Sequence, residues 1–163
     1  MVGFAAARDE VYRRLCAVFG SMAFANLYGD VERPKVFRGF PTTEPPFYVA
    51  VDEIASDVRA TGSASMWHAE YEFGIKVYLF AQHVDLLTAS NTMLAYLDAA
   101  MAAILADATL GGTVDNALPA VDTEGTAADS SRRYMAAAQM TVACRVYSAC
   151  PAEIVEAINE AQG

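Results

Sequence analysis

Residues 67–82, WHAEYEFGIKVYLFAQ, decide the fold. Apolar and polar residues alternate along this stretch for more than ten positions, which is typical of a β-strand with one buried face and one wetted face. The apolar set is Tyr71, Phe73, Ile75, Val77 and Leu79, and the polar set is His68, Glu70, Glu72 and Lys76. Strands usually have five or six residues. The sequence therefore predicts either the central strand of a sheet or one arm of an extended hairpin.

The bulk composition favours a single domain that buries part of its surface against other subunits in an assembly. The chain has 163 residues, 55% of them hydrophobic, and a mean hydropathy of +0.23. This length predicts a single domain over residues 1–163. The net charge of −9 excludes a dedicated nucleic-acid binder, which needs a basic patch for phosphates. It allows a surface past which DNA moves without binding.

Cysteine usage and the N-terminus favour a reducing, cytosolic origin. Cys16, Cys144 and Cys150 form no CxxC pair, and the first two lie in helix-like and strand-like runs where cysteine behaves as a small hydrophobe. Charged residues arrive at positions 8–10, before any long apolar run, so we expect no signal peptide. The alanine-rich stretch 93–106 is too short to span a bilayer.

The first half of the chain predicts a helix and a hairpin. Residues 6–27 have helical apolar spacing, with Gly20 as a weak point. Residues 31–39 are extended and contain Pro34, which suits an edge strand. A strand is predicted from residue 47 to about Val58. Residues 59–65, RATGSAS, read as a mobile hairpin tip leading into the long strand.

The second half predicts another helix, two strands and a short helix. The helix starts at Asp85 or Ser90 and ends near residue 106. Its expected buried stripe comprises Leu87, Leu94, Leu97, Met101, Ile104 and Leu105, with many alanines that suit close packing on a sheet. Residues 113–121 read as a weak strand, 122–131 as a polar loop, and 133–148 as an alternating strand. Pro151 suits the first position of a last helix.

The predicted fold class is therefore α+β. We expect a single domain with a mainly antiparallel or mixed sheet of four or five strands, two main helices packed on it, and a short C-terminal helix.

No set of residues predicts catalysis or a cofactor. His68 and His83 are isolated, and the HVD at 83–85 has no second cluster at ligand spacing, so we expect no metal. The carboxylates Asp52, Glu53 and Asp57 are interpreted as a wet strand edge. LGG at 110–112 lacks the lysine and the spacing of a phosphate-binding loop. We expect no enzymatic activity and no cofactor.

Two further features favour surface contacts. The pairs Arg13–Arg14 and 132–133 (both arginine) are interpreted as salt-bridging residues on a surface or at a subunit interface, with phosphate contact as the alternative. Aromatic residues flank the connector PTTEPP, residues 41–46. They fit either core anchoring or a subunit interface, where aromatic residues concentrate.

The order of these segments resembles that of the tail terminator (tail completion, or minor tail) proteins of long-tailed bacteriophages and prophages. The resemblance covers most of the chain: the leading helix, the segment running into FYVAV, the strand YEFGIKVYLFA with its HVD turn, the helix NTMLAYLDAAMAAILAD, the TLGGTV break and the late strand MAAAQMTVACRVYS. PTTEPP, DTEGTAADSS and the C-terminal PAEIVEAINEA depart from the pattern.

The resemblance implies a structural subunit of the virion, made in the cytoplasm of a bacterial host. It implies a homo-oligomeric ring, commonly a hexamer, that caps the tail tube, stops its polymerisation and forms the head–tail joining surface. The implied partners are the tail tube protein and the head–tail connector protein, with DNA passing through and no membrane contact. Expected interface residues lie in segments 59–66 and 122–133 and on the wet face of the long strand; they are Arg59, Ser63, Met66, Glu70, Glu72, Arg132 and Arg133.

Other functions stay open at this point. A head–tail neck adaptor has a similar size and order of elements. A small-molecule-binding α+β module would place its pocket between sheet and helices. A cellular homo-oligomer with an unknown ligand is a third class.

Overall fold

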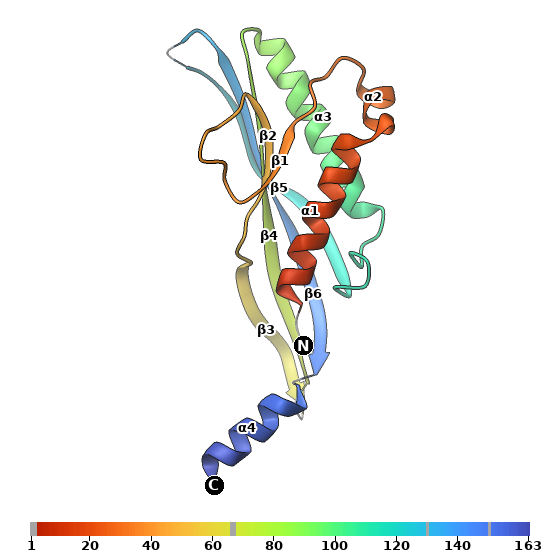
Figure 1. The fold of residues 1–163 in the computed structure, drawn as a ribbon, viewed down its shortest axis with the longest axis vertical. Coiled ribbons are helices and arrows are strands. Elements are labelled where there is room, and N and C mark those ends of the chain that lie inside the picture. Colours follow the sequence, from red (N-terminus) through yellow and green to blue (C-terminus); the bar gives the residue numbers. More distant parts are fainter. Residues whose placement is uncertain (1–2, 66–67, 130, 150) are drawn as a thin grey trace.

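A computed structural model describes residues 3–65, 68–129, 131–149 and 151–163, and it confirms the α+β fold class (Figure 1). The sheet has six strands, one more than the upper expectation, and is mostly antiparallel. The elements in chain order are α1 (Phe4–Gly20), α2 (Met22–Tyr28), β1 (Lys35–Arg38), β2 (Phe47–Val51), β3 (Ser56–Ser65), β4 (His68–His83), α3 (Leu86–Leu105), β5 (Asn116–Ala128), β6 (Tyr134–Ala149) and α4 (Ala152–Gln162).

Strand β4 is both the central strand and a hairpin arm. The sheet order is β1-β2-β4-β6-β5, and β3 pairs with β4 beyond the end of β2. Ser65 pairs with His68 at one end of β4, and Phe47 pairs with Ala81 near the other. Both interpretations of the long strand are therefore correct, because β4 is long enough to pair with β2 and β3 in succession along one edge.

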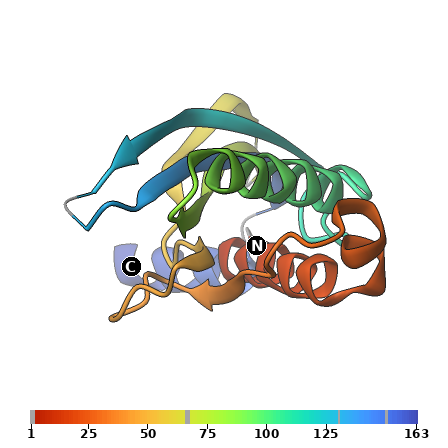
Figure 2. The same ribbon diagram turned by 90° about the horizontal axis from the view of Figure 1, so that it is seen from above.

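The helices cover one face of the sheet. Helix α3 packs on β4, β5 and β6, and α1 lies beside α3 over β1 and β2 (Figure 2). The core under them holds alternate residues of the two longest strands, as predicted from their period-2 patterns. The buried residues of β4 and β6 are Phe73, Ile75, Val77, Leu79, Ala81, Ala136, Ala138, Met140, Val142, Cys144 and Val146.

The predicted first helix is interrupted. Ser21 has an extended backbone, with ψ of 158°, and its side chain accepts a hydrogen bond from the backbone N–H of Phe24 at 3.2 Å. Serine is a preferred N-cap residue, so it begins a new helix directly after the weak point at Gly20. One helix over residues 6–27 is therefore wrong, and two helices, α1 and α2, take its place.

The hairpin was predicted in the wrong place. Strand β2 ends at Val51 rather than near Val58, and residues 52–55 form the connection to β3. Asp57 has a positive φ of 50°, at the irregular start of β3. Residues 59–65 are part of β3 and not a mobile tip, because they pair with β4.

Helix α3 begins as predicted but buries a different face. The side chain of Asp85 caps it by accepting a hydrogen bond from the backbone N–H of Thr88 at 3.1 Å. The predicted stripe is wrong at Leu87, Leu94 and Leu105, which are exposed. Smaller residues and one tyrosine face the sheet instead; the buried set is Ala89, Thr92, Met93, Ala95, Tyr96, Ala99, Ala100 and Ile104. The alanines do allow close packing on the sheet, as expected.

The predicted polar loop at 122–131 is mostly strand. Strand β5 continues to Ala128, which pairs with Tyr134 of β6. Residues 122–128 are exposed and do not alternate between apolar and polar. They are polar because both faces of this part of the strand contact solvent, and not because the segment is a loop.

The end of the molecule opposite the α3 N-terminus is a narrow arm. Strands β3, β4 and β6 run past the ends of α1 and α3, and α4 projects from the arm away from the body (Figure 1). Pro151 is the N-cap of α4 rather than its first residue, and Glu153 occupies the first turn, where the helix dipole favours an anion. Ile154 and Ile158 of this helix are exposed.

Candidate assembly surface

The open face of the sheet carries a row of polar side chains in register across four strands, and the members from three of these strands are charged. Glu72 of β4 is paired with Arg59 of β3 on one side and with Arg145 of β6 on the other, and Arg145 is paired with Asn116 of β5. The contacts are close, at 2.9 Å from Arg59 Nη2 to Glu72 Oε2 and 2.9 Å from Arg145 Nη2 to Glu72 Oε1. Arg145 Nε also lies 3.0 Å from Glu70 Oε1, its diagonal neighbour.

This network balances its own charge. Hydrogen bonds from Arg59 and then Arg145 hold the pKa of Glu72 below its usual range. The row pairs two arginines with two glutamates, so it is charged without having a net charge. Such a row gives orientation to a contact more than affinity, because exposed ion pairs contribute little energy.

A groove of about 520 Å³ lies on the same face. Its lining residues come from β3, β4, β5 and β6; they are Asp57, Arg59, Glu72, Phe73, Gly74, Asn116, Leu118, Thr141, Ala143, Cys144 and Arg145. A Cβ on Gly74 would lie 2.7 Å from Ser56 Oγ and 2.8 Å from Thr141 Cγ2. Glycine is therefore required for close approach of the strands beneath the groove.

The structure brings together only part of the predicted interface. Arg59, Glu70 and Glu72 meet in the charged row. Arg132 and Arg133 lie at the other end of the molecule, in the turn between β5 and β6. Ser63 belongs to β3, but its side chain lies outside the described residues, as does the whole of Met66.

Asp129 makes several hydrogen bonds in the β5–β6 turn. Asp129 Oδ1 accepts hydrogen bonds from the backbone N–H groups of Ser131 and Arg133 at 2.9 and 3.0 Å. Its Oδ2 accepts one from Gln82 Nε2 at 2.6 Å, and hydrogen bonding, first from the Ser131 side chain, lowers the pKa of Asp129. Arg132 has a positive φ of 61° in this turn, and both arginines are exposed to solvent.

Sequence reasoning missed Arg145 as a member of the site. The missing information is the register between β4 and β6, which places Arg145 opposite Glu72. The available signal was that Glu72 and Arg145 are polar residues of opposite charge on two strands with alternating patterns.

The other predicted basic pair serves the body of the protein. Arg13 and Arg14 both bind Glu10, at 2.6 and 3.0 Å, and Arg14 Nη2 also lies 3.0 Å from Asp107 Oδ2. Arg14 thus ties α1 to the segment after α3. The salt-bridge interpretation is confirmed for this pair.

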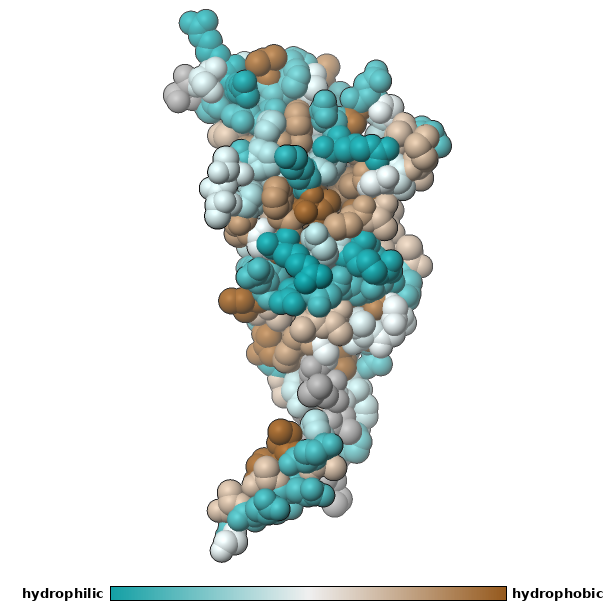
Figure 3. All heavy atoms as spheres, in the orientation of Figure 1, coloured by the Kyte–Doolittle hydropathy of each residue, from teal (hydrophilic) through white to brown (hydrophobic). Residues whose placement is uncertain are grey.

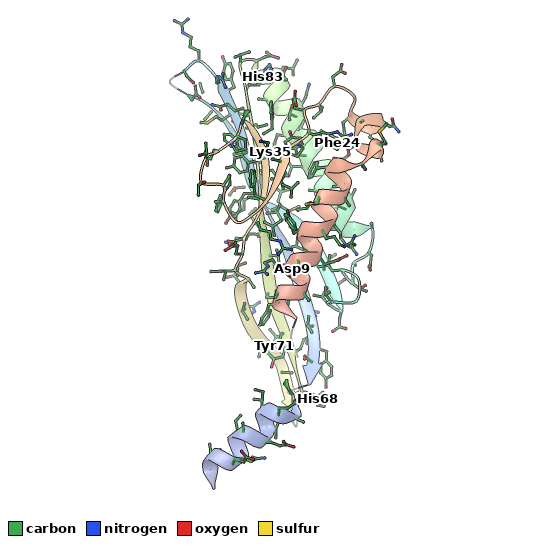
Figure 4. The ribbon with its side chains drawn as sticks, viewed as in Figure 1. Asp9, Phe24, Lys35, His68, Tyr71 and His83 are labelled. Carbon is green, nitrogen blue, oxygen red and sulfur yellow. The ribbon has the colours of Figure 1, made fainter. Side chains whose placement is uncertain are left out.

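The described residues contain no cluster of histidine, cysteine, aspartate or glutamate that could hold a metal ion. His68 and His83 lie at opposite ends of β4 (Figure 4). The imidazole of His83 accepts a hydrogen bond from the Asp85 N–H at 3.0 Å and so supports the start of α3. Burial raises the pKa of the Cys144 thiol to about 12, so this cysteine stays protonated at neutral pH.

Several large apolar side chains on the surface belong to the helices. The solvent side of α3 carries Leu87 and Leu94, which are 67% and 63% exposed. Helix α4 has no buried residue, and Figure 3 shows its hydrophobic and hydrophilic side chains on opposite sides of the helix. None of the described helices combines the length and apolar character that a membrane crossing requires.

Comparison with known proteins gives a structural likeness. No protein-family model and no curated protein matches the chain. Among solved structures, one that resembles it is a chain of a particle described as "Virion of native gene transfer agent (GTA) particle". The two share 13% sequence identity with a TM-score of 0.46, over 89% of this chain and 99% of that chain.

Proposed function

We propose that this chain is a structural subunit of a phage-type virion, and specifically a tail terminator. Copies of it form a ring on the last ring of the tail tube, stop tube polymerisation and present the surface that joins the head. Its partners are further copies of itself, the tail tube protein and the head–tail connector protein. In this role it acts without catalysis and without a cofactor.

The observation that carries the proposal is the unburied C-terminal helix. Helix α4 is amphipathic, yet none of its residues is buried against its own chain. Eleven residues of isolated helix are marginal in water, because helix stability in proteins comes mainly from packing of an apolar face. A subunit whose amphipathic helix α4 is not packed against its own chain is suited to an assembly in which another subunit covers that helix.

The edges and charge of the molecule support the same role. Strand β5 is an edge strand of 13 residues, and β1 forms the opposite edge. Exposed edges allow neighbouring subunits to add strands, although Pro119 and the charged residues of β5 restrict this pairing. The net charge of −9 suits a channel that DNA traverses without being held.

Removing the gene from the genome that encodes the particle tests this function. We expect tails of uncontrolled length and heads without tails in electron micrographs, both restored by supplying the wild-type gene. Ring-shaped particles of the purified protein, seen by negative-stain electron microscopy, would add support. Tails of normal length, joined normally to heads, would contradict the proposal.

The same experiment separates the neck adaptor from the terminator. Loss of a neck adaptor would leave tails of normal length that fail to join heads, whereas loss of a terminator changes tail length as well.

The groove on the sheet favours one function of a different class, the binding of a small molecule. Its volume of about 520 Å³ suits a small ligand, and its lining mixes apolar and charged groups. However, Arg59, Glu72 and Arg145 already satisfy one another there. A thermal-shift screen with small carboxylates and amines addresses this alternative, which requires a rise in Tm that is lost in Arg145→Ala.

A further inference from the structure

Helix α4 presents a narrow apolar face flanked by acid. With 3.6 residues per turn, Ile154, Ile158 and Ala161 fall on one side of the helix. Glu153 and Glu160 lie along the flank of that side. The two isoleucines are 51% and 45% exposed. The helix therefore needs a partner surface with an apolar strip beside positive charge.

The outer face of α3 carries two apolar side chains, Leu87 and Leu94, with the exposed Asn91 between them; the two leucines are called the α3 strip. The sheet-facing side of α3 is already filled by buried residues, yet Leu87 and Leu94 project from the opposite side, seven residues or about two turns apart. Asp98, which is exposed on the same side one turn beyond Leu94, ends the strip. Among the described residues, nothing in the chain covers these leucines.

Positive charge lies beside the start of this strip. Val84, which is exposed, follows His83, and Arg133 precedes Tyr134, the residue paired with His83 across β4 and β6. Neither Arg132 nor Arg133 has an ion pair with another described residue. The β5–β6 turn thus places two unpaired guanidinium groups near the N-terminal end of α3.

We propose that α4 of one copy packs on the outer face of α3 of a second copy. Ile154 and Ile158 contact Leu87 and Leu94, and Glu153 and Glu160 meet Arg132 and Arg133. A second copy is the occupant because both halves of the contact belong to this chain and match in apolar character and in charge. The inference rests on the assembly role proposed above and names the contact that builds it.

Within one copy this contact cannot form. Helix α4 projects from one end of the molecule, while the start of α3 and the β5–β6 turn lie at the other end (Figure 1). Different patches therefore meet, and the contact is heterologous. Repetition of a heterologous contact gives a closed ring if the rotation closes, and an open filament if it does not.

The contact is also small. Helix α4 has eleven residues and is roughly 16 Å long. A helix of this length buries less surface area than a standard stable interface does. We therefore expect a single contact to be weak and a closed ring to be stable, since closure links many weak contacts.

A mixing experiment tests the proposal. One variant, Ile154→Ser with Ile158→Ser, disables α4; a second, Leu87→Ser with Leu94→Ser, disables the α3 strip. Both pairs are exposed, so both variants should fold with the circular dichroism of the wild type. We expect wild-type protein to associate at high concentration in analytical ultracentrifugation and each variant alone to stay monomeric. An equimolar mixture at that same high concentration should give a dimer and nothing larger, because one intact α4 meets one intact strip. This dimer should dissociate at lower dilution than the wild-type assembly, since it has a single contact and no ring closure.

The control and the charge test sharpen the result. Ile54→Ser changes a residue that is 76% exposed but lies on neither surface, and it should associate as the wild type does. Glu153→Arg with Glu160→Arg should weaken association at least tenfold, as should Arg132→Glu with Arg133→Glu. Combining all four charge reversals in one chain should restore most of the lost association.

Three outcomes overturn the contact. They are a wild-type protein that remains monomeric at its highest soluble concentration, association that survives both serine variants, and a variant mixture that forms no dimer. The proposed function is tested separately, by the tail length and the head–tail joining that follow gene removal. If gene removal leaves tail length and joining normal while the mixture dimerises, the contact stands and the terminator function fails. If the mixture fails while gene removal deregulates tail length, only the contact is wrong.

Discussion

Glu72 and Arg145 face each other across the β4–β6 ladder, with 2.9 Å between Glu72 Oε1 and Arg145 Nη2. Arg59 approaches the other carboxylate oxygen of Glu72 from β3. One carboxylate therefore links three strands on the open face of the sheet.

Glu72→Lys should leave the protein folded but alter assembly. The substitution places a third cation between Arg59 and Arg145, on a surface where solvent screens the repulsion. We expect wild-type circular dichroism with a lowered Tm, together with fewer rings in electron micrographs. Lys76→Glu reverses a charge on the same face outside the charged row and serves as the control. Unchanged rings and tail joining in Glu72→Lys would show that this row has no role in assembly.

Ile75→Asp should prevent folding. Ile75 is 1% exposed and lies opposite Val142 in the core beneath the helices. An unpaired carboxylate there loses its water without gaining a partner, at a cost of several kcal/mol. Circular dichroism and one-dimensional NMR should show an unfolded or aggregated chain. Lys76→Asp, one residue on and facing the other side of the sheet, should fold. A folded Ile75→Asp protein would mean that the two faces are assigned wrongly.

Gly74→Ala should destabilise the sheet by about 1 to 3 kcal/mol, the usual cost of overpacking. The new methyl group would meet Ser56 Oγ and Thr141 Cγ2 at less than 3 Å. Urea denaturation gives the free energy of unfolding. Gly125→Ala in β5 is the matched control, because no atom lies within 4 Å of its Cβ position. Adding Ser56→Ala and Thr141→Ser to Gly74→Ala should recover part of the loss; no recovery would argue against this steric cause.

Glu10 should make stability depend on pH in the acid range. The hydrogen bond from Arg13 is the largest cause that lowers the pKa of Glu10 from 4.5 to about 2; burial opposes it and Arg14 adds to it. A carboxyl group with a lowered folded-state pKa stabilises the protein above its unfolded pKa, and this stability is lost as the pH falls from 4.5 towards 2.

Glu10→Gln should therefore cost about 1 kcal/mol at pH 7, since the pair is partly exposed. The difference from wild type should shrink as the pH falls through this window. Chemical denaturation at pH 7, 4.5 and 3 measures it. A difference that stays constant across the three pH values would exclude the ionic contribution.

The sequence predicted what local patterns determine. The buried faces of β4 and β6 follow from alternation around Ile75 and Val142, and the start of α3 follows from the cap at Asp85. Each of these depends on neighbours within a few residues. The α+β class follows in turn, because two half-buried strands need helices on one side.

Prediction from the sequence failed where two sides of a helix were equally apolar, or where both faces of a strand were equally polar. Helix α3 has leucines on one side and small residues on the other, and the sheet takes the small side because it packs more closely. Strand β5 has solvent on both faces near Glu124, so its outer half lacks the alternation that marks a strand. The charged row depends on cross-strand register, which no single stretch encodes.

The unbroken ladder between β4 and β6 has a mechanical consequence. All 16 residues of β4 are paired with β6, from His68 opposite Ala149 to His83 opposite Tyr134. In the proposed assembly, a second copy that pulls on α4 would load β6 along the axis of that strand. Hydrogen bonds that lie perpendicular to the strands share such a load in shear rather than opening one at a time. Tension that arrives at the slender end of the subunit is thereby spread over its whole length before any helix has to move.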